Sequence, residues 1–266
     1  VMISGKTLDA DISVSEYERS LNVQIWKYYG DEADIEIISP SGESSGQIKK
    51  ILGPQRFRLE NTEILLYYGE PAPYSINQEI YIDFIPQRQY LTGGIWTIRL
   101  LPGRIIRGDI QMWLPTAGVL NQNTGFLRPD PDVTLTVPSS AKIPIGVGGM
   151  DQKSGILYLD SGRGNTIASV VKPDFVAPAV GVQAIGRLGN YVTLTGTSAA
   201  SAIAAGACAQ IMEWGNSRGR RLLLNSVQIG NILIRGCERN PDVSYPNTAW
   251  GYGKMNVYDA LMKFYG

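Results

Sequence analysis

Residues 195–206 read Thr-Gly-Thr-Ser-Ala-Ala-Ser-Ala-Ile-Ala-Ala-Gly, and this stretch decides the fold of the second half of the chain. The β-branched and apolar residues 191–194 before it predict a strand that ends near Gly196. The small residues 199–209 predict a helix that neighbouring backbones can approach closely, as at the centre of an α/β domain. Ser198 is therefore expected at a strand-to-helix turn, where the N–H groups of the first helical turn would face an oxyanion.

A purely structural role competes with this chemical role. Thr197 and Ser198 are both of the residue types that favour the N-cap position, so either one could simply cap a buried helix. The chemical interpretation makes Ser198 a candidate nucleophile. The capping interpretation leaves it with no chemistry.

The same stretch resembles the serine motif of the subtilisin-like serine proteases (subtilases), Gly-Thr-Ser-Met-Ala-x-Pro-x-Val-x-Gly, with Ala199 in place of Met and Ala202 in place of Pro. Four further segments are similar to patterns of that family, in the same order along the chain. They are Ile-Gly-Val-Gly-Gly-Met-Asp at 145–151, Asp-Ser-Gly-Arg-Gly at 160–164, Lys-Pro-Asp-Phe-Val-Ala-Pro-Ala-Val at 172–180, and Trp-Gly-Tyr-Gly-Lys-Met-Asn-Val-Tyr-Asp-Ala-Leu at 250–261. The resemblance covers about residues 141–261 and implies the C-terminal half of a subtilase catalytic domain.

In that family the catalytic residues follow in the order Asp, His, Ser, and an oxyanion-binding Asn lies between His and Ser. Only the Ser carries over, onto Ser198. The sequence contains no histidine, although His is the usual base that takes the proton of a serine nucleophile at neutral pH. The resemblance therefore implies that the Asp, the His and the Asn lie on polypeptide upstream of Val1, and that this chain alone is inactive.

Two other classes of function stay open from the sequence. A pseudoprotease would keep the fold as a binding or signalling module. A serine-carboxyl peptidase of the sedolisin type shares Gly-Thr-Ser but uses a Glu instead of His at acidic pH, which would agree with the lack of histidine.

Alternating apolar residues, broken by turn formers, run through the first 115 residues and are typical of the strands of a two-sheet β-sandwich. The expected strands carry the triplets Leu21-Val23-Ile25, Ile64-Leu66-Tyr68, Ile80-Ile82-Phe84, Trp96-Ile98-Leu100 and Ile110-Met112-Leu114, and the pair Ile35-Ile37. A short helix at residues 14–20 is the one competing element. The segment Trp96-Thr97-Ile98-Arg99-Leu100 is similar to the clostridial Csp-type germination proteases, which implies an inserted jelly-roll domain.

The predicted organisation is thus a β-sandwich, jelly-roll-like, at 1–115, a linker at 116–140, and at 141–266 an α/β partial subtilisin-like domain with a mostly parallel sheet. Further strands are expected at 143–148 and 175–177. Helices are expected at 222–234 and at 257–264, the last of them capped by Asn256.

Aromatic residues are frequent in the predicted sandwich. Trp96 and Tyr68 are in phase with buried neighbours and are expected in the core. Trp26 and Trp113 fall on the opposite face, where a surface for the adjoining domain is favoured over a carbohydrate site.

Composition excludes several partners. Lys plus Arg equals Asp plus Glu at 24 each, so no overall field attracts nucleic acid or an acidic membrane surface. No segment reaches the roughly 18 apolar residues of a membrane span. The basic residues Arg218, Arg220 and Arg221 are interpreted as a solvated loop.

Cys208 and Cys237 are expected to be buried free thiols, and neither a cofactor nor a metal is predicted. The expected partners are a protein or peptide substrate and the N-terminal half of the catalytic domain, with a non-native dimer across the open sheet edge as an alternative. The compartment cannot be read from the sequence; the family resemblance implies a secreted or spore-associated protein.

Overall fold

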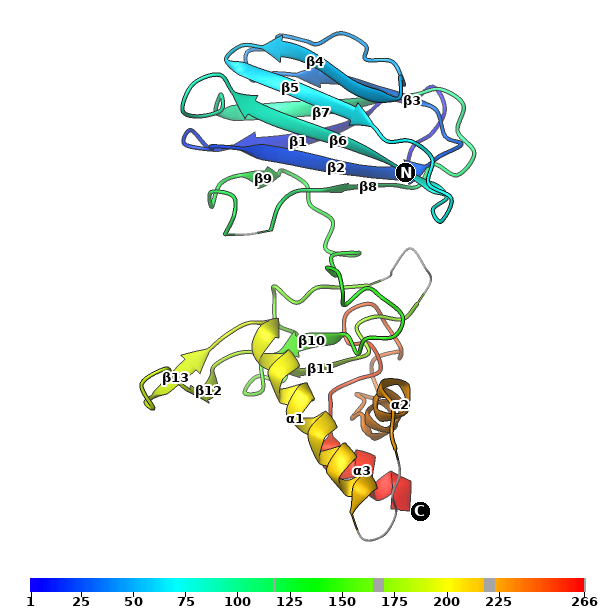
Figure 1. Ribbon diagram of the computed structural model, residues 1–266, viewed down its shortest axis with the longest axis vertical. Coiled ribbons are helices and arrows are strands. Elements are labelled where there is room, and N and C mark those ends of the chain that lie inside the picture. The colour runs from blue at the N-terminus through cyan, green and yellow to red at the C-terminus, as the bar shows by residue number, and fades with distance from the viewer. Residues whose placement is uncertain (117, 165–169, 218–222, 266) are drawn as a thin grey trace. The chain divides into compact units, whose positions relative to one another are not determined.

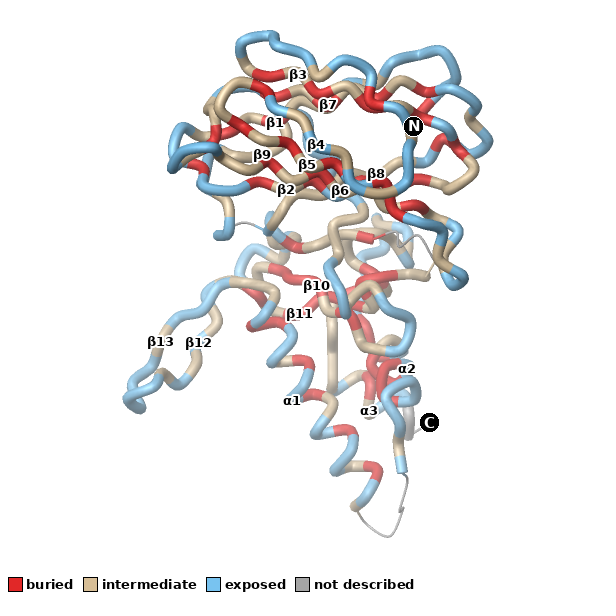
Figure 2. Tube along the Cα trace, turned by 45° about the horizontal axis from the view of Figure 1, so that its top comes forward, coloured by how far each residue is buried: buried red, intermediate tan, exposed pale blue. Residues whose placement is uncertain are grey.

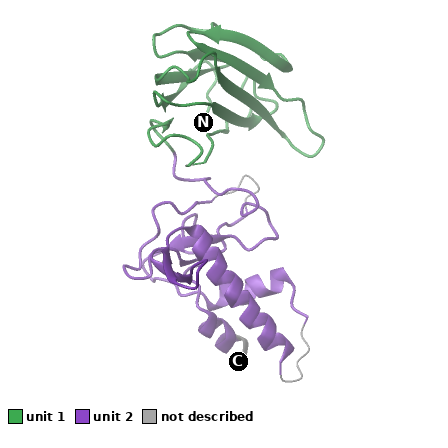
Figure 3. Cartoon of the chain, turned by 60° about the vertical axis from the view of Figure 1, so that its left-hand side comes forward, with its two compact units in different colours: residues 1–129 green, residues 130–266 purple. Residues whose placement is uncertain are grey.

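The computed structural model describes residues 1–116, 118–164, 170–217 and 223–265. The chain divides into two compact units, residues 1–129 and residues 130–266 (Figure 3). The division falls within the predicted linker 116–140. The finer boundaries at 115 and 141 stay predictions.

The first unit is built from antiparallel strands. They are β1 (Leu8–Val14), β2 (Leu21–Tyr28), β3 (Ala33–Ile38), β4 (Gly53–Leu59), β5 (Thr62–Tyr68), β6 (Asn77–Pro86), β7 (Gly94–Pro102), β8 (Ile110–Trp113) and β9 (Gly125–Phe126). One sheet has the strand order β3-β7-β1-β9 and the other has the order β4-β5-β6-β2-β8. The two sheets are stacked on one another (Figure 1), so the predicted sandwich is present and a β-rich fold is confirmed.

One hydrophobic core fills the space between these sheets. Alternate residues of both sheets are buried, because successive side chains of a strand point to opposite faces. Trp96 and Tyr68 are fully buried, as predicted. The rings of Phe84 from one sheet and Trp96 from the other meet edge to face, with 5.2 Å between their centroids.

Three strands of this unit were not predicted, and one predicted helix is wrong. β4 and β9 carry Gln, Arg or Gly and lack a simple apolar alternation, whereas β1 has one, with Leu8, Ala10, Ile12 and Val14, that was not recognised from the sequence. Residues 15–20 are not helical, since they carry the chain from β1 in one sheet to β2 in the other. The ring of Tyr17 in this connection packs against the edge of Tyr90, with 5.5 Å between centroids.

A buried carboxylate fastens the loop before β8 to the sandwich. Oδ1 of Asp31 accepts hydrogen bonds from the backbone N–H groups of Ile106 at 2.6 Å and Arg107 at 3.0 Å, and Oδ2 accepts one from Gly108 at 2.9 Å. Burial would raise the pKa of Asp31, but these donors, with the charge of Lys27, outweigh burial and hold that pKa below its ordinary value of 3.8. The carboxylate therefore stabilises the fold in its charged form.

We expect Asp31→Asn to lower the free energy of unfolding by about 3 kcal/mol at pH 7, because a charged acceptor of three hydrogen bonds is lost. A lowered pKa gives stability that is present above the ordinary pKa and is lost as the pH falls through the folded-state pKa. The difference from the wild type should therefore shrink at acidic pH. Urea unfolding at several pH values measures it, with the exposed Asp109→Asn as control; an equal loss in both variants would contradict this account.

The second unit contains β10 (Val147–Met150), β11 (Phe175–Pro178), β12 (Val182–Ile185), β13 (Tyr191–Leu194), α1 (Thr197–Asn216), α2 (Ser226–Gly236) and α3 (Val257–Tyr265). β10 and β11 pair in parallel, with Val147 opposite Phe175. β12 and β13 form an antiparallel hairpin that projects from the rest of this unit (Figure 1). In the part of the chain that the structure describes, the parallel sheet is thus a single pair of strands, smaller than the mostly parallel sheet expected.

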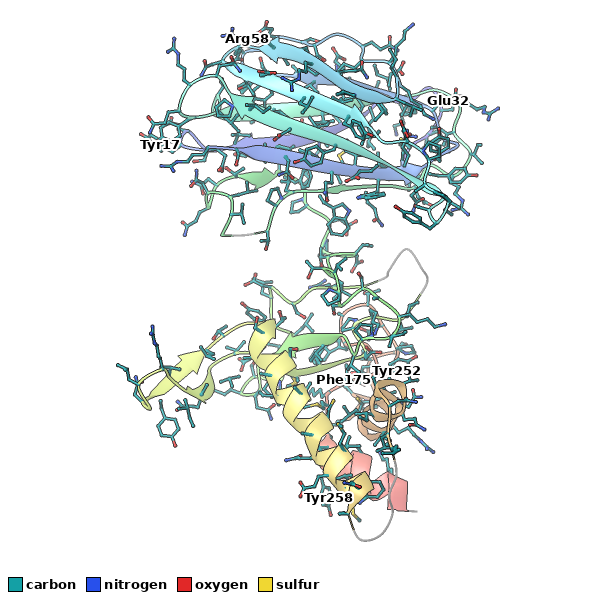
Figure 4. All side chains as sticks on the ribbon, in the orientation of Figure 1. Tyr17, Glu32, Arg58, Phe175, Tyr252 and Tyr258 are labelled. Carbon is teal, nitrogen blue, oxygen red and sulfur yellow. The ribbon has the colours of Figure 1, made fainter. Side chains whose placement is uncertain are left out.

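The three helices pack beside the parallel strands around a second core. Phe175 of β11, labelled in Figure 4, is fully buried and belongs to a cluster with Ala207 and Ile211 of α1 and Leu233 of α2. α1 extends beyond the predicted helix at both ends. α2 begins at Ser226, after an Asn225 capping box, and not at residue 222.

The remaining predictions on this unit have mixed outcomes. Asn256 caps α3 by accepting the N–H of Asp259 at 2.9 Å, as predicted. Cys208 and Cys237 are both free, although Cys208 is only half-buried. Arg218, Arg220 and Arg221 lie outside the described residues. Among the helices that the structure describes, none is both long and apolar enough to cross a membrane.

Candidate active site

Ser198 lies where the sequence predicts it, just after a strand and in the first turn of a helix. β13 ends at Leu194, and α1 begins at Thr197. The turn between them contains Gly196, whose N–H donates to the carbonyl of Ala179 at 2.8 Å. Gly196 has φ of 144°, a region that side-chain-bearing residues rarely adopt. Glycine at this position therefore permits the abrupt change from strand to helix.

The Ser198 side chain is exposed and does not cap the helix. The N-cap residue of α1 is Gly196, and no side chain hydrogen-bonds at the cap. Ser198 is classed among the exposed residues, while Ala199 and Ala200 directly after it are buried. The capping interpretation of Thr197 and Ser198 is therefore wrong, and the Ser198 hydroxyl is presented to solvent.

The electrostatic environment of this hydroxyl is that of a helix N-terminus. α1 is 20 residues long, and its first turn carries no acidic side chain. The positive end of the helix dipole is thus not neutralised by the helix itself. Such an end stabilises negative charge that develops close to Ser198, such as the charge on the oxygen of a carbonyl group under attack by a hydroxyl.

A glycine of β10 lets the parallel strands approach the start of α1. A Cβ atom at Gly149 would lie 2.7 Å from Cβ of Ala179 and 3.3 Å from Cγ2 of Thr197. Any side chain at this position would therefore displace the segment that carries Ser198. The N–H of Gly149 is held in turn by Oγ of Ser161, at 2.9 Å.

A buried ion pair holds the segment that leads into β11. The ammonium group of Lys172, almost fully buried, donates to Oδ2 of Asp174 and to the carbonyl of Pro144, each at 2.6 Å. Oδ2 of Asp174 also accepts the N–H of Gly146 at 2.7 Å. Lys172 and Asp174 thus tie the start of β11 to the residues before β10.

We expect Lys172→Met to lower the free energy of unfolding of the second unit by about 3 kcal/mol, because it leaves the Asp174 carboxylate and a carbonyl without their donor. Thermal and urea unfolding measure the effect. Lys142→Met, at an exposed lysine, is the matched control. A loss below about 1 kcal/mol, the usual size for a surface ion pair, would show that the pair is not structural.

One side of α1 is apolar and uncovered. Buried and exposed positions alternate along the helix (Figure 2), and small apolar residues on its exposed side are Ala202, Ala205 and Ala209. A groove of about 340 Å³ runs between this side and the strand β10. Its lining includes Ile145, Val147, Ala205, Ala209 and Met212.

The strand beside this groove also has an edge that is only partly covered: Gly149 donates its N–H to Oγ of Ser161 and accepts the N–H of Tyr158 there, but no second described strand pairs with β10. Among the described strands, β11 alone pairs with β10. Sequence reasoning found the small residues of α1 but did not predict that one side of the helix would be uncovered.

The described residues supply an exposed serine at a helix N-terminus but no complete catalytic set. The sequence has no histidine, and no group of three or more His, Cys, Asp or Glu side chains that could hold a metal ion occurs in the described part of the chain. The thiol of Cys237 is inert, since burial raises its pKa to about 12.

Comparison with known proteins places the chain among peptidases. The sequence model of the subtilase family matches residues 121–253. The membrane-bound transcription factor site-1 proteases of Mus musculus and Homo sapiens are 33% and 32% identical to the chain over 133 residues. These matches cover 48% of the chain and 12% of each of those proteins.

The CspB protease of Clostridium perfringens has a similar structure, with a TM-score of 0.90 and 29% sequence identity. The superposition covers 96% of this chain and 54% of CspB. The chain therefore spans about half the length of this structural relative, and it resembles the Csp proteases across both of its units.

Proposed function

The chain belongs to the subtilase family, and on that premise we propose that it is the serine-bearing part of a subtilisin-like serine endopeptidase with Ser198 as the nucleophile. The observation that carries this proposal is the position of the Ser198 side chain, exposed at the uncapped N-terminus of α1. Exposure is common for serine, but exposure in the first turn of a helix that no side chain caps is the placement that a serine nucleophile needs.

In the proposed reaction, Oγ of Ser198 attacks the carbonyl carbon of the scissile peptide bond. A base takes the hydroxyl proton as the new C–O bond forms, and the carbonyl oxygen becomes an oxyanion. The N–H of Ser198 and the dipole of α1 stabilise that oxyanion. The amine leaves with the proton from the base, and water then hydrolyses the acyl-enzyme and regenerates Ser198.

We propose that the base, its orienting carboxylate and the second oxyanion donor lie on polypeptide outside residues 1–266. The lack of histidine supports this, because this chain has no residue for the usual role of the base. The coverage of 54% of CspB also supports it, since the relative has a further half to which the rest of the site can belong.

The same missing polypeptide would complete the parallel sheet. The partly open edge of β10 and the apolar groove beside α1 are the natural places for a further strand and its flanking residues. Parallel sheets are normally buried, so the part of this edge that residues 156–161 leave free is expected to be covered by that polypeptide. In its absence we expect that edge to favour a non-native dimer.

We further propose that residues 1–115 are a jelly-roll domain inserted into the catalytic domain, with 116–140 as the linker. The pairing of β1 with β7 and of β2 with β6 supports this, because strands from the start of the unit pair with strands much later in the chain in both sheets. The likeness to CspB over 96% of the chain supports the combination of both units in one protein.

Peptide hydrolysis tests the proposal. We expect a longer protein that contains this chain to cleave a fluorogenic peptide library, and residues 1–266 alone to cleave none of it. Cleavage by the longer protein near pH 7 excludes the sedolisin alternative, while an optimum well below neutral would support it. A longer protein that folds but cleaves nothing at any pH would contradict the endopeptidase and support a pseudoprotease.

A further inference from the structure

A row of aromatic and amide side chains crosses the outer face of the five-stranded sheet, and the proposed peptidase activity gives it no role. Cross-strand partners define the row: Pro54 is opposite Tyr67, Tyr67 is opposite Tyr81, Tyr81 is opposite Gln24, and Gln24 is opposite Trp113. We call these five residues the aromatic row. They come from β4, β5, β6, β2 and β8, which are all the strands of this sheet.

The row lies on the face of the sheet away from the core. On the three central strands the neighbours of the row's members are fully buried, namely Leu66, Tyr68, Ile80, Ile82, Val23 and Ile25, whereas the neighbours of Pro54 and Trp113 on the edge strands are partly buried. Because successive side chains point to opposite faces, the row points outward. Gln24 and Pro54 are exposed, and the Tyr67 side chain is 38% exposed. Side chains stand on the outer face of this sheet in Figure 4.

Polar groups border the row on both sides. On one side Asp83 and Asn22 are cross-strand partners. On the other side Trp26 lies between Glu79 and Gln111. Burial, with the charges of Asp83 and Glu79, raises the pKa of Tyr81 and keeps its phenol a hydrogen-bond donor.

We propose that the aromatic row binds a neutral oligosaccharide. A sugar ring has an apolar face of C–H groups that packs on an aromatic ring, and hydroxyl groups at its edge that bond to amides and carboxylates. The row offers rings along its length, and the borders offer Asn22, Asp83 and Glu79 along its sides. Tyr67 and Trp113 are three strand spacings apart, about 14 Å, which suits a short linear chain of sugars.

The charged side chains around the aromatic row favour a neutral ligand. The row itself contains no group that is charged at neutral pH. One border carries Arg56 and Asp83, with Leu65 between them, and the other border carries Glu79. Arg56 is also paired with Glu63 at 2.9 Å. A strongly anionic or cationic ligand would thus meet charges of its own sign, whereas a neutral one would not.

Titration with defined sugars tests the proposal. Cellotetraose, maltotetraose and chitotetraose are added separately to the whole chain, and binding is followed by tryptophan fluorescence and calorimetry. We expect saturable binding of at least one of them, with a dissociation constant of about 1 mM or tighter. Trp113→Ala and Tyr81→Ala should each weaken that binding by about tenfold, since each removes one stacked ring.

Gln24→Ala separates a loss of binding from a loss of folding. Gln24 is exposed, so its replacement should weaken binding without changing the melting temperature. Tyr74→Ala, at a tyrosine that is 92% exposed outside the row, is the control and should bind normally. No saturable binding of any of the three sugars up to about 10 mM would overturn the proposal. Equal binding by wild type, Trp113→Ala and Tyr81→Ala would overturn it as well.

Discussion

In a longer protein that contains this chain, Ser198→Ala should reduce kcat/KM for a peptide substrate by about 10⁶-fold, the size of the loss when the nucleophile of subtilisin is removed. The reason is the loss of the covalent route, because the remaining groups cannot form an acyl-enzyme. Peptide cleavage kinetics on purified wild type and variant measure the effect.

The same variant should leave the melting temperature nearly unchanged, because the Ser198 side chain is exposed and caps nothing. Ser217→Ala, at the other end of α1, is the control and should retain activity. If Ser198→Ala still cleaved the peptide, Ser198 would not be the nucleophile. A large fall in the melting temperature of Ser198→Ala would show that the Ser198 side chain stabilises the fold.

The second large effect concerns the uncovered side of α1. Ala205→Arg should leave the melting temperature of residues 1–266 unchanged, because Ala205 is exposed there. In the longer protein the same change should cost about 3 kcal/mol or more and abolish cleavage, because the new charge would be buried without a partner. Thermal unfolding of both proteins measures this contrast.

Gln210→Arg is the matched control, since Gln210 is exposed on the same helix but does not line the groove. It should be tolerated in both proteins. Equal tolerance of Ala205→Arg and Gln210→Arg in the longer protein would show that nothing packs into the groove. In that case the additional polypeptide completes the site in some other way.

Most strands of the sandwich with a strict apolar alternation could be predicted, although β1, which has the same pattern, was missed. β6, with Ile80, Ile82 and Phe84 buried, has that pattern, and β2 has it as well. β4 could not be predicted, because Arg56 and Arg58 alternate with residues that are only partly buried at the edge of the sheet. Its place is fixed by pairing with β5, a contact that a single sequence does not display.

The second unit was predictable in its helices and less so in its sheet. Tyr191–Leu194 was expected as a strand, but its antiparallel partner Val182–Ile185 was not recognised, because half of that partner is Gln and Ala. The expected extent of the parallel sheet rested on the family resemblance. Among the described strands, β10 and β11 are the parallel ones.

The position of Ser198 was predictable, whereas its surroundings were not. Small residues after Gly196 identify the turn and the helix from local sequence alone. The groove depends on which side of α1 meets β11, which is a tertiary contact. The aromatic row likewise depends on strand register. Tyr67 and Tyr81 become neighbours only through the pairing of β5 with β6, and Trp113 joins the row only through β2.

The most direct measurement is labelling with a fluorophosphonate probe, which reacts with a serine only when that serine is activated as a nucleophile. It is applied in parallel to residues 1–266 and to a longer protein that contains them, and the labelled residue is identified by mass spectrometry. We predict labelling of the longer protein at Ser198 and no labelling of residues 1–266, which lack a histidine. Stoichiometric labelling of Ser198 in residues 1–266, or labelling of another serine in the longer protein, would contradict the account.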